Sequence, residues 1–292
     1  MSPRLSGVIA AVPTPVHRDR TIDVERFLAH SRWVLENGCD AINILGSTGE
    51  ATSFAPERRA ELMREAARAL PGAHMMVGTG TSDLETTIRL TSLAGACGFA
   101  AALVLPPYYY SGVSDDGLYA YFDAVVRETQ GNPVPIYLYN FPQMTGVPFS
   151  QSLAARLKAA HPERIAGAKD SSGDLDYAES LARIADFDVF PSNETSLAVA
   201  PEKGYAGTIS ATLNITSRLA AELRSDPADA SVLGRLRQIR ETIAARPLVP
   251  AVKYLVGCRL QDPAWATVMP PFVPLTQSEC DALAPLVQEL AV

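Results

Sequence analysis

The sequence has few of the side chains that hold metals or form disulfides. Its four cysteines stand at positions 39, 97, 258 and 280, so they form no CxxC pair. This spacing argues against both a disulfide framework and a zinc site. The four histidines, at positions 17, 30, 74 and 161, show no HxH or HxxxH spacing. We therefore expect packing or surface roles for them and predict no metal site.

Long apolar runs and basic clusters are also missing. No stretch of eighteen apolar residues occurs, which argues against a membrane-spanning helix, and the short apolar run near the start does not fit a secretory signal. The formal charge is -7, and no group of lysines and arginines is interleaved with aromatic residues. Nucleic acid and anionic membranes are thus poor partners. We expect a cytoplasmic protein that binds a small molecule.

The chain does contain a regular alternation of short apolar runs and longer segments of helical period. Its 292 residues could hold two average domains or one barrel. Eight runs rich in β-branched residues are predicted as parallel strands. They span 7–12, 40–45, 74–80, 101–107, 134–140, 164–170, 187–192 and 206–211. Eight such units predict an α/β fold of the (β/α)8 TIM barrel type.

A doubly wound sheet is the competing α/β architecture. It usually stops at about five to seven strands and carries GxGxxG after the first. Here the first run leads into VPTPV, and GTGTSD from Gly78 lacks the third glycine. We predict a tight turn there, with Ser82 or Asp83 as the helix cap. The barrel is predicted to occupy residues 1–215, and residues 216–292 to form a C-terminal helical extension packed on it as one structural unit.

Residues just past the carboxyl ends of barrel strands meet at one mouth, where active sites lie. Lys169 ends the apolar run IAGAK, so we place its amine in the mouth, where loss of hydration disfavours the ammonium form. A neutral amine attacks a ketone, and the resulting imine withdraws electrons so that a C–C bond can break. The alternative is a structural lysine neutralised by Asp170.

Two neighbours favour the catalytic interpretation. Tyr139 ends the preceding run and places a phenol at the same height, able to move a proton; the alternative is a core aromatic bonded to the backbone. The segment GSTGE, from Gly46 to Glu50, supplies amides and hydroxyls that can hold a carboxylate, although the same residues also fit a plain βα turn. Together these parts predict a site for a 2-oxo acid.

The chain resembles the dihydrodipicolinate synthase / N-acetylneuraminate lyase superfamily of class I, Schiff-base pyruvate aldolases. The motifs that carry the resemblance occur in order, at strand-like intervals, over nearly the whole chain. They are AAVPTPV, GSTGE, PPYYY, YNFP, GAKDSSGD, GTISATLN, PAVKYL and PPFVPL. The resemblance implies a barrel that acts as a pyruvate-dependent lyase. We expect no metal and no organic cofactor, because the imine itself is the electron sink.

The resemblance also implies a role for each residue near the ketone. Lys169 matches the Schiff-base residue and Tyr139 the general acid/base. Ser47 and Thr48, beside Gly46, match the residues that hold the pyruvyl carboxylate.

Further positions match residues at the edge of the site. Tyr109, in PPYYY, matches a tyrosine that reaches into the adjacent subunit's site and continues a hydroxyl relay through the serine of GSTGE to the catalytic phenol. The complete site then requires an oligomer, and we expect a homotetramer, a dimer of dimers. Ile209 matches the residue whose backbone carbonyl faces the imine. Ser171 and Glu194 occupy positions that meet the distal part of sugar-acid substrates.

Some positions depart from named members of the family. Met144 stands where the synthase carries an arginine that grips the carboxylate of aspartate semialdehyde, and a thioether cannot form that salt bridge. The sialic-acid lyases have a serine and an Asp-Glu pair where this chain has Ala211 and Glu194-Thr195. Glycine is usual at the position of Ser192.

A distal pocket with Ser171, Asn193, Glu194 and Thr195, and without a cationic clamp, suits a neutral polyhydroxy tail. The leading hypothesis is therefore cleavage of a 2-keto-3-deoxy sugar acid to pyruvate and an aldehyde, or the reverse addition. The alternatives are 4-hydroxy-tetrahydrodipicolinate synthase, which joins pyruvate to aspartate semialdehyde, and a dehydratase or deaminase that uses the same imine. A keto-acid-binding sensor is the non-enzymatic alternative, although binding alone needs neither the lysine nor the phenol.

Overall fold

Eight parallel strands lie side by side in the order β7-β6-β5-β4-β3-β2-β1-β8. The computed structural model describes residues 4–290, so the predicted limits at residues 1 and 292 lie outside the described residues. The strands are Gly7–Ala11 (β1), Ala41–Ile44 (β2), Met75–Gly78 (β3), Ala101–Val104 (β4), Ile136–Asn140 (β5), Ile165–Asp170 (β6), Asp188–Pro191 (β7) and Gly207–Ser210 (β8).

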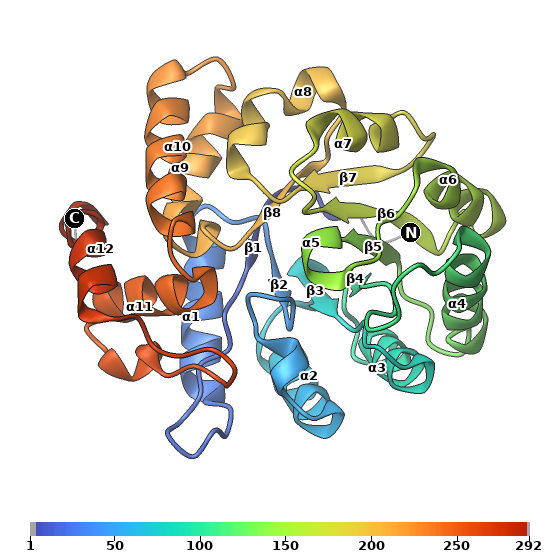
Figure 1. Ribbon diagram of the computed structural model, residues 1–292, viewed down its shortest axis with the longest axis horizontal. Helices are drawn as coiled ribbons and strands as arrows, with labels where there is room; N and C mark the ends of the chain where they lie inside the picture. The colour runs from blue at the N-terminus through green and yellow to red at the C-terminus, as the bar shows by residue number, and fades with distance from the viewer. Residues whose placement is uncertain (1–3, 291–292) are drawn as a thin grey trace.

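The first and last strands of this order meet and close the ring. The N–H of Ala206 donates to the carbonyl oxygen of Val189 at 3.0 Å, and the hydroxyl of Thr208 donates to the carbonyl oxygen of Pro191 at 2.8 Å. Each of the eight predicted runs contains one of the strands. The predicted (β/α)8 barrel is therefore confirmed (Figure 1).

Helices alternate with the strands and surround the ring (Figure 1). Pro56 opens α2 and Asp83 caps α3, where its carboxylate accepts a hydrogen bond from the N–H of Thr86 at 2.7 Å. The α-helices are Val24–Glu36 (α1), Pro56–Ala69 (α2), Leu84–Ala96 (α3), Asp115–Glu128 (α4), Pro142–Thr145 (α5), Gln151–Ala160 (α6), Leu175–Ala182 (α7), Ala200–Lys203 (α8), Leu213–Ser225 (α9), Ala230–Ala244 (α10), Leu248–Leu260 (α11) and Gln277–Leu290 (α12). The 3-10 turns are Ala51–Ser53 (η1), Gly72–His74 (η2), Glu194–Ala198 (η3) and Pro263–Ala266 (η4).

Strand side chains alternate between two hydrophobic cores. Ile42 and Ile44 of β2 belong to the outer core, which the helices cover. Ile9, Met76 and Tyr137 belong to a smaller inner core inside the ring. This period of two lets the same strands bury one face under helices and fill the barrel with the other.

A β-bulge in β6 decides where the lysine of this strand points. The register between β5 and β6 shifts by one residue after Ile165. Ile165 lies in the outer core and Ala166 in the inner one, yet Ala168, which strict alternation would place inside, lies in the outer core. Lys169 therefore faces the interior. Gly167 permits the bulge, because a Cβ there would stand 2.0 Å from a backbone oxygen of β7.

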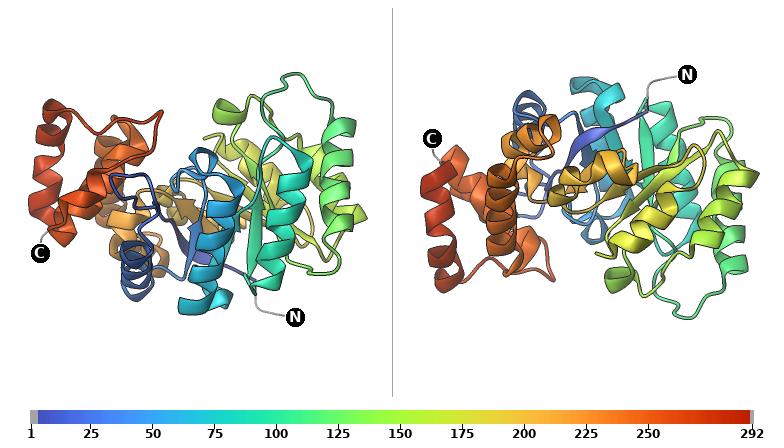
Figure 2. Two further views of the ribbon diagram at one scale, coloured as in Figure 1. Left: turned by 90° about the horizontal axis from the view of Figure 1, so that it is seen from below. Right: turned by 90° about the horizontal axis from the view of Figure 1, so that it is seen from above.

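The C-terminal helices α10, α11 and α12 pack together next to α1 and α9 (Figure 2). Their shared core contains Ile243, Leu255, Trp265 and Leu283, together with Ile215 from α9. This core includes residues from both sides of the predicted boundary at residue 215. The boundary and the single structural unit stay predictions. None of the helices within residues 4–290 is long and apolar enough to cross a membrane.

Candidate active site

A cavity of about 510 Å³ lies at the carboxyl ends of the strands. Its walls come from the segments that follow each strand from β2 to β8 and from the C-terminal extension. Most of the residues predicted to form the site line this cavity, namely Gly46, Ser47, Thr48, Tyr139, Lys169, Ser171 and Ile209. The structure thus brings them together, whereas Tyr109 and Glu194 are not part of the lining.

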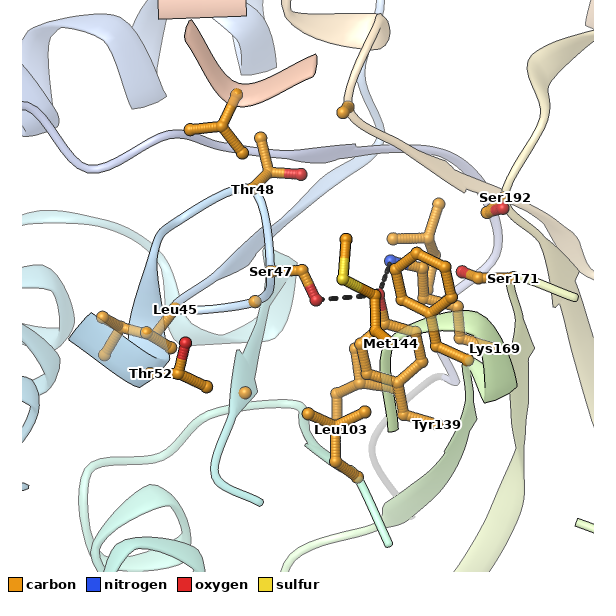
Figure 3. Close-up of a pocket in the computed structure, with 18 of the residues that line it drawn as sticks. Leu45, Ser47, Thr48, Thr52, Leu103, Tyr139, Met144, Lys169, Ser171 and Ser192 are labelled. Atoms are coloured by element: carbon orange, nitrogen blue, oxygen red, sulfur yellow. Dashed lines mark hydrogen bonds between the residues drawn. The ribbon is translucent and has the colours of Figure 1, made fainter. Parts of the chain in front are cut away.

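Lys169 and Tyr139 meet at the floor of the cavity. The two residues are register partners on adjacent strands, and Lys169 Nζ donates a hydrogen bond to Tyr139 Oη at 3.2 Å. Ser47 Oγ lies 3.2 Å from the same phenolic oxygen, so the three groups form a continuous chain (Figure 3). Only 5% of the lysine and 2% of the tyrosine are exposed. An amine and a proton-transfer group therefore share a nearly dry site.

Asp170, the next residue of the strand, is turned away from the lysine. Its carboxylate accepts hydrogen bonds from Asn140 Nδ2 at 2.7 Å and from Ser172 Oγ at 2.8 Å. Burial raises the pKa of the Asp170 carboxyl, and these hydrogen bonds oppose the rise. Within residues 4–290, no carboxylate forms an ion pair with Lys169. Asp170 therefore does not neutralise Lys169, as the alternative interpretation of this lysine required.

The turn after β2 has the chemistry of a carboxylate site. The backbone N–H groups of Ser47 and Thr48 donate to no acceptor among the described residues, and both residues line the cavity. Gly46 lets the turn pack closely, because a Cβ there would stand 2.6 Å from Asn43 Nδ2. Two free amides beside two hydroxyls can hold the carboxylate of a 2-oxo acid without a cation.

Glu50 anchors the same turn to the C-terminal extension. Lys253 of α11 donates to Glu50 Oε2 at 2.6 Å, and the N–H of Met269 donates to Oε1 at 2.7 Å. Burial lowers the pKa of Lys253, while the Glu50 carboxylate opposes the change. The turn that carries Ser47 and Thr48 is thereby tied to a segment two hundred residues further along the chain.

Hydroxyls and apolar groups share the outer part of the cavity. Ser171 and Ser192 follow β6 and β7 on one side (Figure 3), and Thr145 lies on α5. Met144, also on α5, is 68% exposed and stands at the rim with Phe272. No cationic side chain therefore occupies the position of the synthase arginine.

Glu194 lies behind the cavity wall rather than in it. It is fully buried, and Arg240 Nη1 donates to its carboxylate at 2.8 Å. Three hydroxyls also donate to it, those of Ser210 on β8, Thr212 just before α9 and Thr216 on α9. Its predicted contact with substrate stays a prediction, but Arg240 of α10 and Ser210 are the members of this cluster that line the cavity. From the sequence we expected a distal pocket without a cationic clamp. That expectation did not include Arg240, whose guanidinium belongs to a residue of the cavity lining.

Tyr109 lies outside the cavity of its own chain. It is 86% exposed, has a φ of 101°, and its ring packs edge-on against Tyr110 with centroids 5.4 Å apart. A positive φ is strained for a tyrosine and persists only where other contacts hold the loop. Tyr108 lines the cavity instead. The relay from Ser47 to Tyr109 is not formed within one chain, so its role across a subunit boundary stays a prediction.

Arg240 and Lys253 were missed by reasoning from the sequence. Both belong to helices that the strand-end rule does not place at the mouth. A signal for Arg240 exists: Leu236, Ile239 and Ile243 form the buried stripe of α10, and Arg240 falls on it, four residues after Leu236. A charged residue on a buried stripe indicates a specific partner.

Fold and site together define a (β/α)8 protein with a buried lysine, a phenol and a carboxylate-binding turn at one mouth. The model of the dihydrodipicolinate synthetase family matches residues 4–290. The chain belongs to this family, whose members are pyruvate-dependent class I aldolases and lyases.

Individual relatives agree with this assignment. A 4-hydroxy-tetrahydrodipicolinate synthase of Dechloromonas aromatica is 32% identical over 222 residues, 75% of this chain and 74% of that protein. The crystal structure of dihydrodipicolinate synthase from Agrobacterium tumefaciens is 30% identical, with a TM-score of 0.91 over 98% of this chain and 99% of that one. The prophage protein YagE of E. coli K12, solved with pyruvate, is 26% identical, with a TM-score of 0.88 over 98% of each chain.

Proposed function

We propose that the protein is a lyase that forms a Schiff base between Lys169 and a 2-oxo acid and cleaves, or forms, the bond between C3 and C4 of a 2-keto-3-deoxy sugar acid. The observation that carries the proposal is the buried amine of Lys169, which has a phenol at 3.2 Å and no carboxylate in an ion pair among the described residues. An amine in this setting is a nucleophile toward a ketone.

The first step attaches the substrate. The amides and hydroxyls of Ser47 and Thr48 hold the carboxylate, which places the C2 ketone at the lysine. The nitrogen of Lys169 attacks C2, the ketone oxygen leaves as water after proton transfer, and a protonated imine remains. Tyr139 supports proton transfer in this step because its hydroxyl is within hydrogen-bond distance of the lysine nitrogen.

Bond cleavage uses the imine to accept electrons. Tyr139 removes the proton of the C4 hydroxyl, the C3–C4 electron pair moves toward the imine to give an enamine, and C4 leaves as an aldehyde. The hydroxyl of Ser47, 3.2 Å from Tyr139 Oη, is placed to pass the proton onward. The enamine then takes a proton at C3, and water hydrolyses the imine to release pyruvate.

The distal wall favours a hydroxylated tail. Ser171 and Ser192 supply hydroxyls on the outer part of the cavity, and its volume of about 510 Å³ exceeds the needs of pyruvate alone. A dehydratase or deaminase would use the same imine and expel water or ammonia instead of an aldehyde. The identity of the released products distinguishes an aldolase from a dehydratase or a deaminase.

Condensation of pyruvate with aspartate semialdehyde is the second candidate, because the relative from Dechloromonas aromatica carries the name of that synthase. Met144 argues against it, since a thioether replaces the arginine that would bind the second carboxylate. We further propose a cytoplasmic homotetramer, in which Tyr109 of one subunit enters the site of another.

A substrate panel tests the proposal. The purified protein is incubated with 2-keto-3-deoxy acids of five and six carbons, and pyruvate and the aldehyde are measured; a separate reaction contains pyruvate plus aspartate semialdehyde. We expect pyruvate release from at least one keto-deoxy acid and slow or no condensation. Rapid condensation would favour the synthase, and binding of keto acids without any turnover would favour the sensor.

A further inference from the structure

A buried ion pair forms the cavity wall above β7 and β8. Glu194, at the start of η3, is fully buried, and Arg240 of α10 reaches it from the C-terminal extension. Arg240 Nη1 donates to Glu194 Oε2 at 2.8 Å, to Ser210 Oγ at 2.9 Å and to Thr212 Oγ1 at 3.1 Å. One nitrogen of the guanidinium thus makes all three contacts.

The carboxylate of Glu194 is fully engaged by protein donors in this structure. Its Oε1 accepts from the hydroxyls of Thr212 and Thr216, and its Oε2 accepts from Ser210 and Arg240. A carboxylate offers about four acceptor sites, so all are taken. The protons of the Ser210 and Thr212 hydroxyls are also committed, because both donate to this carboxylate.

The other edge of the guanidinium is open. Within residues 4–290, Nε and Nη2 of Arg240 make no hydrogen bond. Neither atom is shut off from solvent, in contrast to the buried and unpartnered Nε atoms of Arg59 and Arg259. Arg240 is one of the residues that line the cavity, and this edge is the unpaired, solvent-accessible part of its guanidinium. Nε and Nη2 form the fork that binds a carboxylate or phosphate through two parallel hydrogen bonds.

The part of the wall formed by Arg240 and Ser210 offers donors and no free acceptor. A guanidinium stays charged and cannot accept a hydrogen bond, whereas a sugar hydroxyl is satisfied best where it both donates and accepts. Glu194 holds the side chain of Arg240 in place, so less conformational entropy of this side chain is lost when an anion binds. Met144, across the cavity, supplies no competing cation.

The position suits the far end of the substrate. Arg240 contacts Ser210 at the end of β8, and Lys169 is the last residue but one of β6, so β7 lies between them. Two strand spacings amount to about 10 Å. A chain of five or six carbons attached at Lys169, together with its terminal group, spans that order of distance.

We infer that Arg240 is a specificity-determining residue that binds an oxyanion, a carboxylate or a phosphate ester, at the end of the substrate remote from the ketone. The inference rests on the proposed Schiff-base function and deepens it: the preferred 2-keto-3-deoxy sugar acid carries a second acidic group rather than a neutral end. Arg240 places its cation beside the end of β8, away from Met144 on α5, so it does not restore the arginine clamp of the synthase.

A competition experiment tests this inference without requiring turnover. The full-length protein is mixed with carbon-13-labelled pyruvate and one unlabelled probe, borohydride is added, and mass spectrometry gives the ratio of the two reduced adducts. The probes are a 2-keto-3-deoxyhexonic acid with a neutral C6 hydroxyl, its C6 carboxylic analogue and its C6 phosphate ester. Any pyruvate cleaved from a probe is unlabelled, so it still counts toward the probe.

The parent protein should favour at least one acid-ended probe over the neutral one by about tenfold or more. Arg240→Gln should weaken trapping of that probe by about 10- to 100-fold and change trapping of the neutral probe by less than about threefold. Arg237→Gln is the matched control, because it removes the same charge from an exposed position of α10, and it should leave both ratios unchanged.

Arg240→Gln leaves Glu194 as an unpaired buried carboxylate, so the double variant Arg240→Gln/Glu194→Gln is measured beside it and should show the same loss of preference. Equal trapping of neutral and acid-ended probes by the parent protein, or a preference that survives in the double variant, would overturn the role of Arg240. Absence of any adduct, labelled or unlabelled, would instead refute the proposed function.

Discussion

Two buried lysines of the same chain have opposite surroundings. Lys253, with no exposed surface, lies 2.6 Å from the carboxylate of Glu50 and joins the C-terminal extension to the turn after β2. Lys169 is 5% exposed, and its nitrogen meets the phenol of Tyr139 rather than a carboxylate. The nitrogen of Lys253 is engaged by a carboxylate in an ion pair, whereas the nitrogen of Lys169 lines the cavity, where a ketone can reach it. Burial alone therefore does not mark the nucleophile; the partner does.

The comparison predicts that Lys169→Met removes activity and little else. Cleavage should fall to the detection limit, because no other described side chain in the cavity can form the imine. The free energy of unfolding should change by less than about 1.5 kcal/mol, since methionine is of similar length and no buried carboxylate loses its partner. Assays of pyruvate release and urea unfolding check both parts. Retained turnover would refute the nucleophile.

Tyr139→Phe should lower kcat by about 10²- to 10⁴-fold, because the group that moves the C4 proton is lost. Tyr137→Phe is the matched control on the same strand. Its hydroxyl donates to Asp188 at 2.8 Å near the other end of the barrel, and burial together with that carboxylate raises its pKa. Removing it should cost stability, about 1–3 kcal/mol, and spare kcat. Equal losses of kcat in the two variants would contradict the assignment.

Lys253→Met should show the reverse pattern to Lys169→Met. Glu50 is left as an unpaired buried charge, so the free energy of unfolding should fall by about 3–5 kcal/mol. The double variant Lys253→Met/Glu50→Gln should recover part of that loss. Urea unfolding of the parent, the double variant and the two single variants, Lys253→Met and Glu50→Gln, measures the coupling. A single variant as stable as the parent would show that the pair is not important for stability.

Tyr109→Phe should slow catalysis by about tenfold if its hydroxyl completes a relay in another subunit. Mixed oligomers test this arrangement sharply. Co-expression of Tyr109→Phe chains with Lys169→Met chains produces some sites that combine an intact lysine with an intact tyrosine from the neighbour, so activity should exceed the sum of the two variants. Tyr110→Phe, at an exposed neighbouring position, is the control. Purely additive activities would place Tyr109 outside the relay.

The last prediction concerns His30 of α1, which is buried against α9 and α11. Its Nε2 lies 2.8 Å from Asn214 Oδ1, and Arg259 Nη2 donates to its Nδ1 at 3.0 Å. Burial, and then the charge of Arg259, lower the pKa of His30 to about 3. The unfolded chain takes up this proton below about pH 6.5 while the folded one does not.

Stability should therefore decline as the pH falls from about 6.5 toward 3, by up to about 1.4 kcal/mol per pH unit from this residue. Unfolding curves of the parent and His30→Gln at several pH values isolate the contribution, and the difference between them should grow with pH. Parallel pH profiles would show that His30 titrates alike in both states.

The barrel could be predicted from the sequence because the pattern that indicates it is local. Eight apolar runs with helical segments between them leave few topologies, and all eight contain a strand. The inward direction of Lys169 depends on a bulge at Gly167, where β6 takes one residue more than β5, and this register is a property of two strands together. The strand-end rule placed the lysine correctly without that detail.

The distal wall was less accessible to such reasoning. The sequence places Glu194 after β7, but its hydrogen bonds come from β8, α9 and α10, and only the packed structure shows that they use all of its acceptor sites. Arg240 reaches the cavity from a helix whose docking depends on long-range contacts. Residues supplied by a remote element are the part of a site that strand order cannot predict.

Reductive trapping tests the central claim most directly. The protein is incubated with pyruvate, reduced with borohydride, digested and mapped by mass spectrometry. We predict one added three-carbon acid per chain, carried by Lys169, with Lys253 unmodified. An adduct on another lysine, or none at all under conditions in which the protein remains folded, would contradict the account.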